Sequence, residues 1–201
     1  MGRLAFIDTE TTGLDPINNE IIEIAIKIID TKKVDWGMRE DWQTDEYGEF
    51  VRHDMQGSTM PTEYEFEGKF KIRCMETASP KALEINGYNE DEWQDAYSWS
   101  KVACERLLER LKGCVIVGHN VQFDINFIRE ECRRQGVWCP RFATLDTKGM
   151  ARFLWEDFKS VSMDNIRKEL PEYFVTEGSH RAMKDVNDCI TIWNLFSREG
   201  C

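Results

Sequence analysis

Alternation of apolar and polar residues predicts strands in the first third of the chain. An apolar run opens residues 4–8 and ends in an acid. In residues 21–29, isoleucine alternates with Glu, Ala and Lys, which is the pattern of a strand with one buried face. Residues 69–74 alternate again, with Phe, Ile and Cys opposite basic side chains. We therefore expect three early strands, one in each of these segments.

Helical spacing of apolar residues dominates the later part of the chain. Residues 101–112 carry apolar side chains at helical intervals, and Gly113 is placed to end that helix. The other expected elements are a short helix in 79–88, strands at 114–117 and 142–145, a helix from about 122 that stops at Gly136, a helix capped by Ser162, and a last helix that starts near Asp185. Three strands followed by alternating helices and strands predict an α/β fold, with a mixed five-stranded sheet covered by helices on both faces.

Residues 34–67 interrupt these patterns. They show no clear period and contain ten acids against two arginines. Loops of this length are usually functional or disordered. We expect an acidic insertion, most simply a solvated variable loop. Docking of a partner, gating of a substrate channel and repulsion of duplex nucleic acid are the alternatives. The chain length favours a single domain, 1–201.

Composition narrows the class of protein. Seven cysteines without paired spacing indicate reduced thiols and not a disulfide framework. No apolar run approaches the roughly 20 residues of a membrane helix, and the first residues do not resemble a signal peptide. We therefore expect a cytoplasmic protein without a membrane segment. The net charge of −11 opposes binding to nucleic acid, but the acidic insertion accounts for most of it. Phosphates can then be bound by local basic residues.

Asp8 and Glu10 are the first candidates for chemistry. Residues two apart in a strand point to the same side, so these carboxylates lie together at the end of a buried strand. They repel each other unless a cation lies between them, and oxygen ligands of this kind suit Mg²⁺ or Mn²⁺. The spacing alone is also common at solvated strand ends, so the interpretation depends on the rest of the chain.

Two later segments supply further candidate residues. Residues 117–124 read VGHNVQFD, which places Asp124 in the first turn of a helix. Residues 180–185 read HRAMKD, with His180 five positions before Asp185. Together with FIDTETTGL at residues 6–14, and in this order, these segments resemble the DEDDh subtype of 3′-5′ exonucleases. The resemblance extends to the proofreading subunit of bacterial replicative polymerases and its free-standing relatives.

The resemblance implies a ribonuclease-H-like fold, in which strands one to three are antiparallel and the later strands are parallel to the first. It implies two divalent cations, Mg²⁺ or Mn²⁺, held by Asp8, Glu10, Asp124 and Asp185. Asp8 would bridge both ions, Glu10 and Asp185 would hold the water-activating ion, and Asp124 the other. His180 would be the general base.

The resemblance also implies contacts with the terminal nucleotides. The residues expected to make them are Glu10, Thr11, Thr12, Leu14, Asn86, Asn120, Phe123 and His180. Asn86 stands where the family pattern has histidine, which weakens the match there. Phe123 has an equally good interpretation as a core residue. His119 and Asp146 are interpreted as structural.

The expected function is a 3′-5′ exonuclease that releases nucleoside 5′-monophosphates, preferably from single-stranded DNA. It would act alone or docked on a DNA polymerase or another replication or repair protein. The motifs do not read a 2′ hydroxyl, so trimming of RNA 3′ ends is an alternative. A catalytically silent binding module on the same fold is a third possibility, which the five intact polar residues argue against. The sequence contains no P-loop, which argues against an NTPase.

Overall fold

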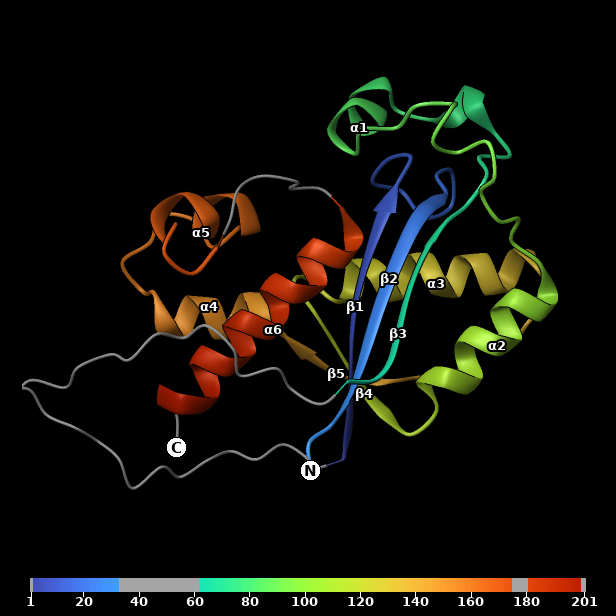
Figure 1. Cartoon of the computed structure of the whole chain (residues 1–201). Helices are drawn as coiled ribbons and strands as arrows, with labels where there is room; N and C mark the ends of the chain where they lie inside the picture. The colour runs from blue at the N-terminus through green and yellow to red at the C-terminus, as the bar shows by residue number, and fades with distance from the viewer. Residues whose placement is uncertain (1, 33–61, 175–180, 200–201) are drawn as a thin grey trace, which may run out of the picture.

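A mixed five-stranded sheet forms the centre of the computed structural model, which describes residues 2–32, 62–174 and 181–199 (Figure 1). The strand order is β3-β2-β1-β4-β5. β1 is antiparallel to β2 and β2 to β3, whereas β4 is parallel to β1 and β5 to β4. The strands are β1 Arg3–Thr11, β2 Ile21–Asp30, β3 Thr62–Lys69, β4 Cys114–Gly118 and β5 Ala143–Asp146. The expected α/β, ribonuclease-H-like topology is confirmed.

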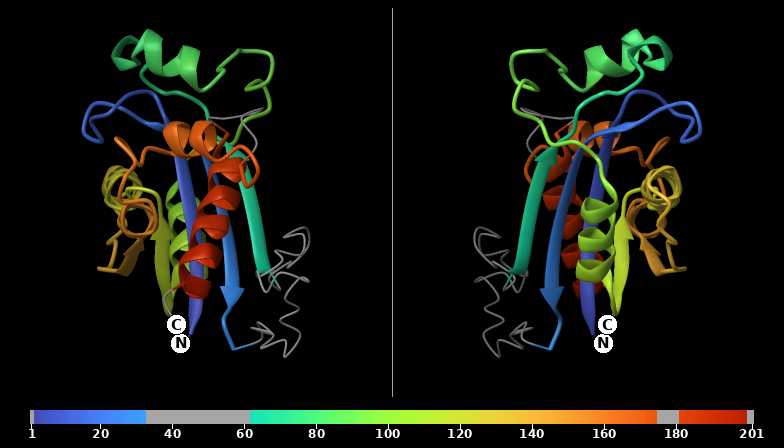
Figure 2. Two further views of the ribbon diagram at one scale, coloured as in Figure 1. Left: turned by 90° about the vertical axis from the view of Figure 1, so that its left-hand side faces the viewer. Right: turned by 90° about the vertical axis from the view of Figure 1, so that its right-hand side faces the viewer.

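Helices cover both faces of the sheet (Figures 1 and 2). The helices are α1 Pro80–Ile85, α2 Lys101–Leu111, α3 Gln122–Arg134, α4 Thr147–Leu154, α5 Met163–Glu169 and α6 Ala182–Glu199, with a short 3₁₀ helix at Met75–Thr77. One core cluster joins Ala5 and Ile7 of β1 to α2 and α3. The other joins Leu4 and Phe6 to α4, α5 and α6. Because alternate residues of β1 face different helices, this strand is buried on both sides.

Helix ends follow the signals in the sequence. Ser79, Ser100 and Ser162 precede α1, α2 and α5, and each hydroxyl accepts a hydrogen bond from a backbone N–H in the first turn. Gly113 and Gly136 follow α2 and α3 with φ of 74° and 67°, a conformation that glycine adopts without a Cβ clash. Within the described part of the chain, no helix is both long and apolar enough to cross a membrane.

The prediction for the third strand was wrong. The strand spans Thr62–Lys69, so the end of the expected insertion belongs to the sheet, and residues 34–61 lie outside the described part. Glu63 and Glu65 read as loop residues because they are charged, but they lie on an edge strand and pair with Arg3 and Lys27. Tyr64 and Phe66 pack against the core between them. An edge strand accepts outward charges because its face meets water.

Two further differences concern β1 and α4. β1 continues to Thr11, past the expected end at residue 8, so both Asp8 and Glu10 lie within the strand. Helix α4 was not expected, because it has only eight residues and contains Gly149. Its N-cap is Asp146, whose carboxylate accepts from the N–H groups of Lys148 and Asn120. The structural interpretation of Asp146 is thereby confirmed.

Candidate active site

Three carboxylates meet where β1 and α6 lie side by side. Asp8 and Glu10 come from alternate positions of β1, and Asp185 comes from the first turn of α6, which starts next to that strand (Figure 1). One oxygen from each side chain lies within 4.8 Å of the oxygens of the other two. Residues separated by about 175 positions therefore form one acidic group, here called the acidic cluster.

Asp124 approaches the same region from α3. Its side chain is 2% exposed, and its Oδ1 accepts a hydrogen bond of 2.7 Å from the hydroxyl of Thr9. Asp124 lies outside the group of three but close enough for its charge to raise the pKa of Asp8. The structure thus brings all four predicted acids to one end of the sheet.

Burial and mutual repulsion disfavour ionisation of these acids. Burial raises the pKa of Asp8 well above its usual range, and the charges of Asp124, Asp185 and Glu10 act in the same direction. Burial, followed by the charges of Asp185 and Glu23, raises the pKa of Glu10 to about 8. Burial raises the pKa of Asp124 to about 7, although the hydrogen bond from Thr9 lowers it in part. Crowded oxygen donors of this kind fit a hard divalent cation such as Mg²⁺ or Mn²⁺, which removes the repulsion.

His180 lies outside the described residues, so its role as a base stays a prediction. The residues that follow it are anchored beside the acidic cluster. The N–H of Ala182 donates to Glu23 Oε1 at 3.1 Å, and Arg181 pairs with the same carboxylate at 3.4 Å. Glu23 of β2 lies opposite Glu10 in the strand register. Arg181 and Ala182 are therefore fixed to the residue that pairs with Glu10 in the sheet.

The turn after β1 is held by its own side chains. The Thr11 hydroxyl donates to the carbonyl of Gly13 at 2.6 Å. The Thr12 hydroxyl is fully buried and accepts from the N–H of Glu20 at 2.9 Å. These hydroxyls stabilise the turn, and their contact with substrate stays a prediction. Leu14, in contrast, is 85% exposed at the tip of the same turn.

Asn86 connects α1 to the end of β1. Its side-chain amide is buried and donates to the carbonyl oxygen of Thr11 at 2.8 Å. Asn86 thus lies beside the turn that the sequence assigns to the terminal nucleotide. Contact of Asn86 with a nucleotide stays a prediction.

Two other predicted substrate residues lie at the start of α3. Asn120 has φ of 70°, and its N–H donates to Asp146. Phe123 is half-buried, and its ring centroid lies 4.8 Å from that of Phe127 in the core. Core packing of Phe123 is therefore observed, and nucleotide contacts by both residues stay predictions. His119 is structural, because its two ring nitrogens contact the Val161 carbonyl and the Thr147 hydroxyl.

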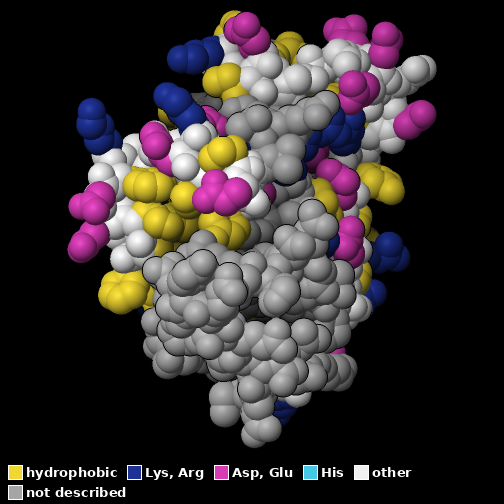
Figure 3. Space-filling view, turned by 60° about the vertical axis from the view of Figure 1, so that its left-hand side comes forward, with side chains coloured by type: hydrophobic (Ala, Val, Ile, Leu, Met, Phe, Trp, Pro, Cys, Tyr) yellow, Lys and Arg dark blue, Asp and Glu magenta, His cyan; other side chains and the backbone are white. Residues whose placement is uncertain are grey.

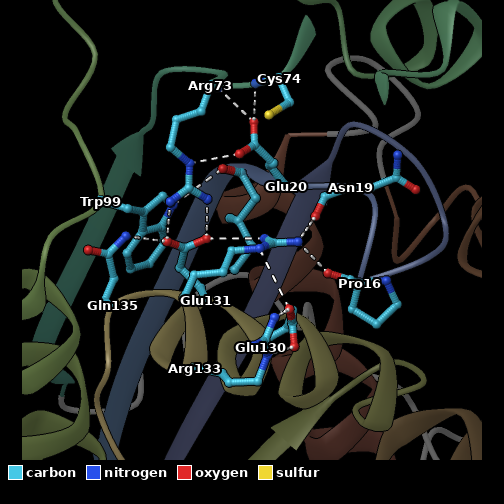
Figure 4. A network of polar contacts seen from close by, with 12 residues as sticks. Pro16, Asn19, Glu20, Arg73, Cys74, Trp99, Glu130, Glu131, Arg133 and Gln135 are labelled. Carbon is cyan, nitrogen blue, oxygen red and sulfur yellow. Dashed lines mark hydrogen bonds and ion pairs between the residues drawn. The ribbon is translucent and has the colours of Figure 1, made fainter. Parts of the chain in front are cut away.

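A network of ion pairs fixes the β1–β2 connection against α3 (Figure 4). Arg73 pairs with Glu20 at 2.7 Å and with Glu131 of α3 at 2.6 Å. Arg134 donates to the backbone carbonyls of Pro16, Ile17 and Asn19. The connection that carries Leu14 is therefore anchored to α3. The sequence analysis missed this network, since nothing local links residues 16–20 to residue 134.

The sequence analysis also missed Arg167 of α5. Its side chain is only 1% exposed and pairs with Asp185 and Asp188 of α6. The sequence offers little signal for it, because an arginine in a helix with an apolar face is ordinarily a surface residue. The positive charge of Arg167 therefore lies at the edge of the acidic cluster.

Comparison with protein families gives one extended match. The model of a family described as RNase_T, Exonuclease, matches residues 5–193. A PolC-type DNA polymerase III from Caldanaerobacter subterraneus subsp. tengcongensis is 30% identical over 186 residues, which are 92% of this chain and 11% of the polymerase. The 3′-5′ exonuclease DinG of Bacillus subtilis is 22% identical over 84% of this chain and 15% of its own length. The chain thus spans only a small part of these relatives.

Solved structures show the same architecture. Escherichia coli exonuclease I, in a zinc-bound complex with single-stranded DNA, matches with a TM-score of 0.70 and 16% identity. The match covers 98% of this chain and 41% of exonuclease I. At this level of identity the similarity establishes the fold.

Proposed function

The chain belongs to the RNase_T exonuclease family, and we propose that it hydrolyses DNA from a free 3′ end in a metal-dependent reaction. The observation that carries this proposal is the acidic cluster of Asp8, Glu10 and Asp185, with Asp124 close by. Four acids this close together would destabilise the folded protein if they bound no cation. Single-stranded ends are the preferred substrate, because a duplex end must first be unpaired.

The four acids share one proposed role, which is to bind metal. Asp8, Glu10, Asp124 and Asp185 hold two divalent cations, Mg²⁺ or Mn²⁺. When bound, such a pair supplies an activated water and neutralises charge on the attacking and leaving oxygens. The imidazole of His180 takes the proton from the attacking water, and its ordinary pKa near 6.5 suits that task at neutral pH. The products are nucleoside 5′-monophosphates.

The turn after β1 gives the proposed reaction its polarity. Glu10 and the backbone of Thr11 bind the terminal 3′ hydroxyl, and Asn86 orients the Thr11 peptide through its hydrogen bond. The connection beyond Thr11 turns back to β2 and is fixed there by Arg134. A continuing nucleic-acid strand would collide with it, whereas a free end fits. The exposed side chain of Leu14 is placed to pack on a terminal base.

DNA is the substrate we favour over RNA. The similar proteins include a DNA polymerase and an exonuclease solved with single-stranded DNA. On the side of the molecule shown in Figure 3, the described surface mixes acidic and basic side chains without a continuous basic patch. We expect separate basic residues to bind the phosphates. Association with a polymerase or another repair protein, and a cytoplasmic location, stay predictions.

The test uses 5′-labelled single-stranded DNA and RNA of one sequence, incubated with Mg²⁺, Mn²⁺ or EDTA. We expect stepwise shortening of DNA from the 3′ end with either metal and none with EDTA. Asp8→Ala should abolish shortening, while Glu109→Ala, which removes an exposed acid of α2 that pairs with Lys112, should not.

Other outcomes identify the alternatives. Faster shortening of RNA would identify an RNA-trimming enzyme. Binding of DNA without hydrolysis would indicate a silent module. Cleavage of closed circular DNA at the same rate as linear DNA would contradict an exonuclease.

A further inference from the structure

A buried arginine connects α5 to the acidic cluster. Arg167 Nε donates to Asp188 Oδ2 at 2.8 Å, and its Nη2 lies 2.7 Å from the same oxygen. Nη2 also donates to Oδ1 of Asp185. The guanidinium therefore bridges two acids that lie on one side of α6, three residues apart. Its planar group of donors can hold two carboxylates at once in a fixed geometry.

The contact with Asp185 is more than is needed to balance the charge of Asp188. Asp188 already has a second cation, because Lys184 lies 3.1 Å from its Oδ2. A third acid, the exposed Asp164, lies 3.4 Å from Arg167 Nη1. Asp188 and Asp164 alone would give the buried arginine the partners that a structural ion pair requires. The remaining contact goes to a member of the acidic cluster.

We infer that Arg167 is a positioning residue, which holds Asp185 by one oxygen and directs the other toward the metal site. This inference rests on the proposed function. The charges of Asp8 and Glu10 favour rotation of the Asp185 carboxylate away from them, since like charges repel. Arg167 opposes this rotation by fixing Oδ1.

Binding of Mn²⁺ in the absence of nucleic acid tests this role directly. The free ion is counted by its electron paramagnetic resonance signal. We expect Arg167→Met to weaken Mn²⁺ binding by about 10–100-fold, the range typical of residues that orient metal ligands. Arg167→Lys keeps a cation and should recover part of the affinity. Arg133→Met removes an arginine that is exposed on α3 and pairs with Glu130, and this variant should bind Mn²⁺ like the wild type.

Two more variants distinguish an effect on the position of Asp185 from an effect on folding. Asp188→Asn removes the structural partner but keeps the Asp185 contact, so its Mn²⁺ affinity should match the wild type. Arg167→Met with Asp188→Asn also removes the acid that loses its arginine partner, and it should bind Mn²⁺ as weakly as Arg167→Met alone. Both should retain the wild-type circular dichroism spectrum at the assay temperature.

Turnover provides a second measurement. In Arg167→Met, kcat should fall while KM for a single-stranded oligonucleotide stays within about twofold, because substrate binding residues are untouched. Unchanged or tighter Mn²⁺ binding in Arg167→Met would overturn the inference and leave the proposed function intact. Failure of the wild type to bind Mn²⁺ would overturn both.

Discussion

The residues of the candidate site form two groups. One group consists of the acids proposed to bind metal, and the other consists of residues that stabilise the turn beside those acids. Asp8, Glu10 and Asp185 form the acidic cluster. Asn86 and Thr12 have buried polar groups that are already bonded within the protein. A substitution in the first group should change chemistry, and one in the second should change the shape of the turn. The assignment of each residue depends on its contacts more than on its type.

The proposed role of His180 as a general base can be tested separately from metal binding. We expect His180→Ala to lower kcat by roughly 10²–10⁴-fold, the usual contribution of a general base. The wild-type rate should rise with pH through the ordinary histidine pKa near 6.5, and this limb should be absent in the variant. Ser179→Ala, at the adjacent position, is the matched control and should keep the limb. A variant with the wild-type rate at every pH would refute the role.

At the scale of elements, the position of the β1–β2 connection depends on α3. Arg134 extends from the last turn of that helix and ties down three carbonyls that have no partner in a strand. Glu131, one turn earlier, pairs with Arg73 and so also anchors the segment that leads to α1. Helix α3 therefore supplies Asp124 at its start and holds the β1–β2 connection at its end.

Arg134→Met tests this scaffold. The three carbonyls lose their donor, so the turn that carries Leu14 should loosen, and KM for a single-stranded oligonucleotide should rise by about tenfold, or ~1.4 kcal/mol. Affinity for Mn²⁺ should not change. Arg133→Met is the control, because it removes an exposed arginine of the same helix that pairs locally with Glu130. An equal rise of KM in both variants would indicate a general loss of positive charge instead.

For the whole molecule, the acidic cluster makes stability depend on pH and metal. The pKa of Glu10 is raised from 4.5 to about 8, so the folded state binds this proton more tightly than the unfolded state does. Without metal, the free energy of unfolding should therefore fall as pH rises from about 4.5 to about 8. A divalent cation binds the ionised form and should restore stability, more strongly at the upper end of this range.

Thermal unfolding in EDTA and in Mg²⁺, across this pH range, measures the effect. Asp8→Asn removes one of the repelling charges, so its melting temperature in EDTA should fall less steeply with pH. Mg²⁺ should raise the melting temperature of the variant less than that of the wild type. Parallel curves for the two proteins would show that the acidic cluster does not control this dependence.

Much of the fold follows from local patterns in the chain. The isoleucine alternation of β2, the serine caps and the glycines after α2 and α3 act over a few residues, so the sequence predicts them directly. β3 was misplaced because its acidic residues are typical of loops until the edge of the sheet gives them water and basic partners. Charge pattern alone does not distinguish a solvated loop from the outer face of an edge strand.

The sequence by itself determined that Asp8 and Glu10 share one side of a strand, because that follows from strand geometry. Through family resemblance it also singled out Asp124 and Asp185. Only the tertiary structure decided that α6 brings Asp185 within 4.8 Å of the other two acids, and that Arg167 and Arg134 hold the site from elsewhere in the chain. Such contacts join residues far apart in sequence, whose meeting depends on how helices pack on the sheet. The periodicity of apolar residues along the chain does not predict these contacts.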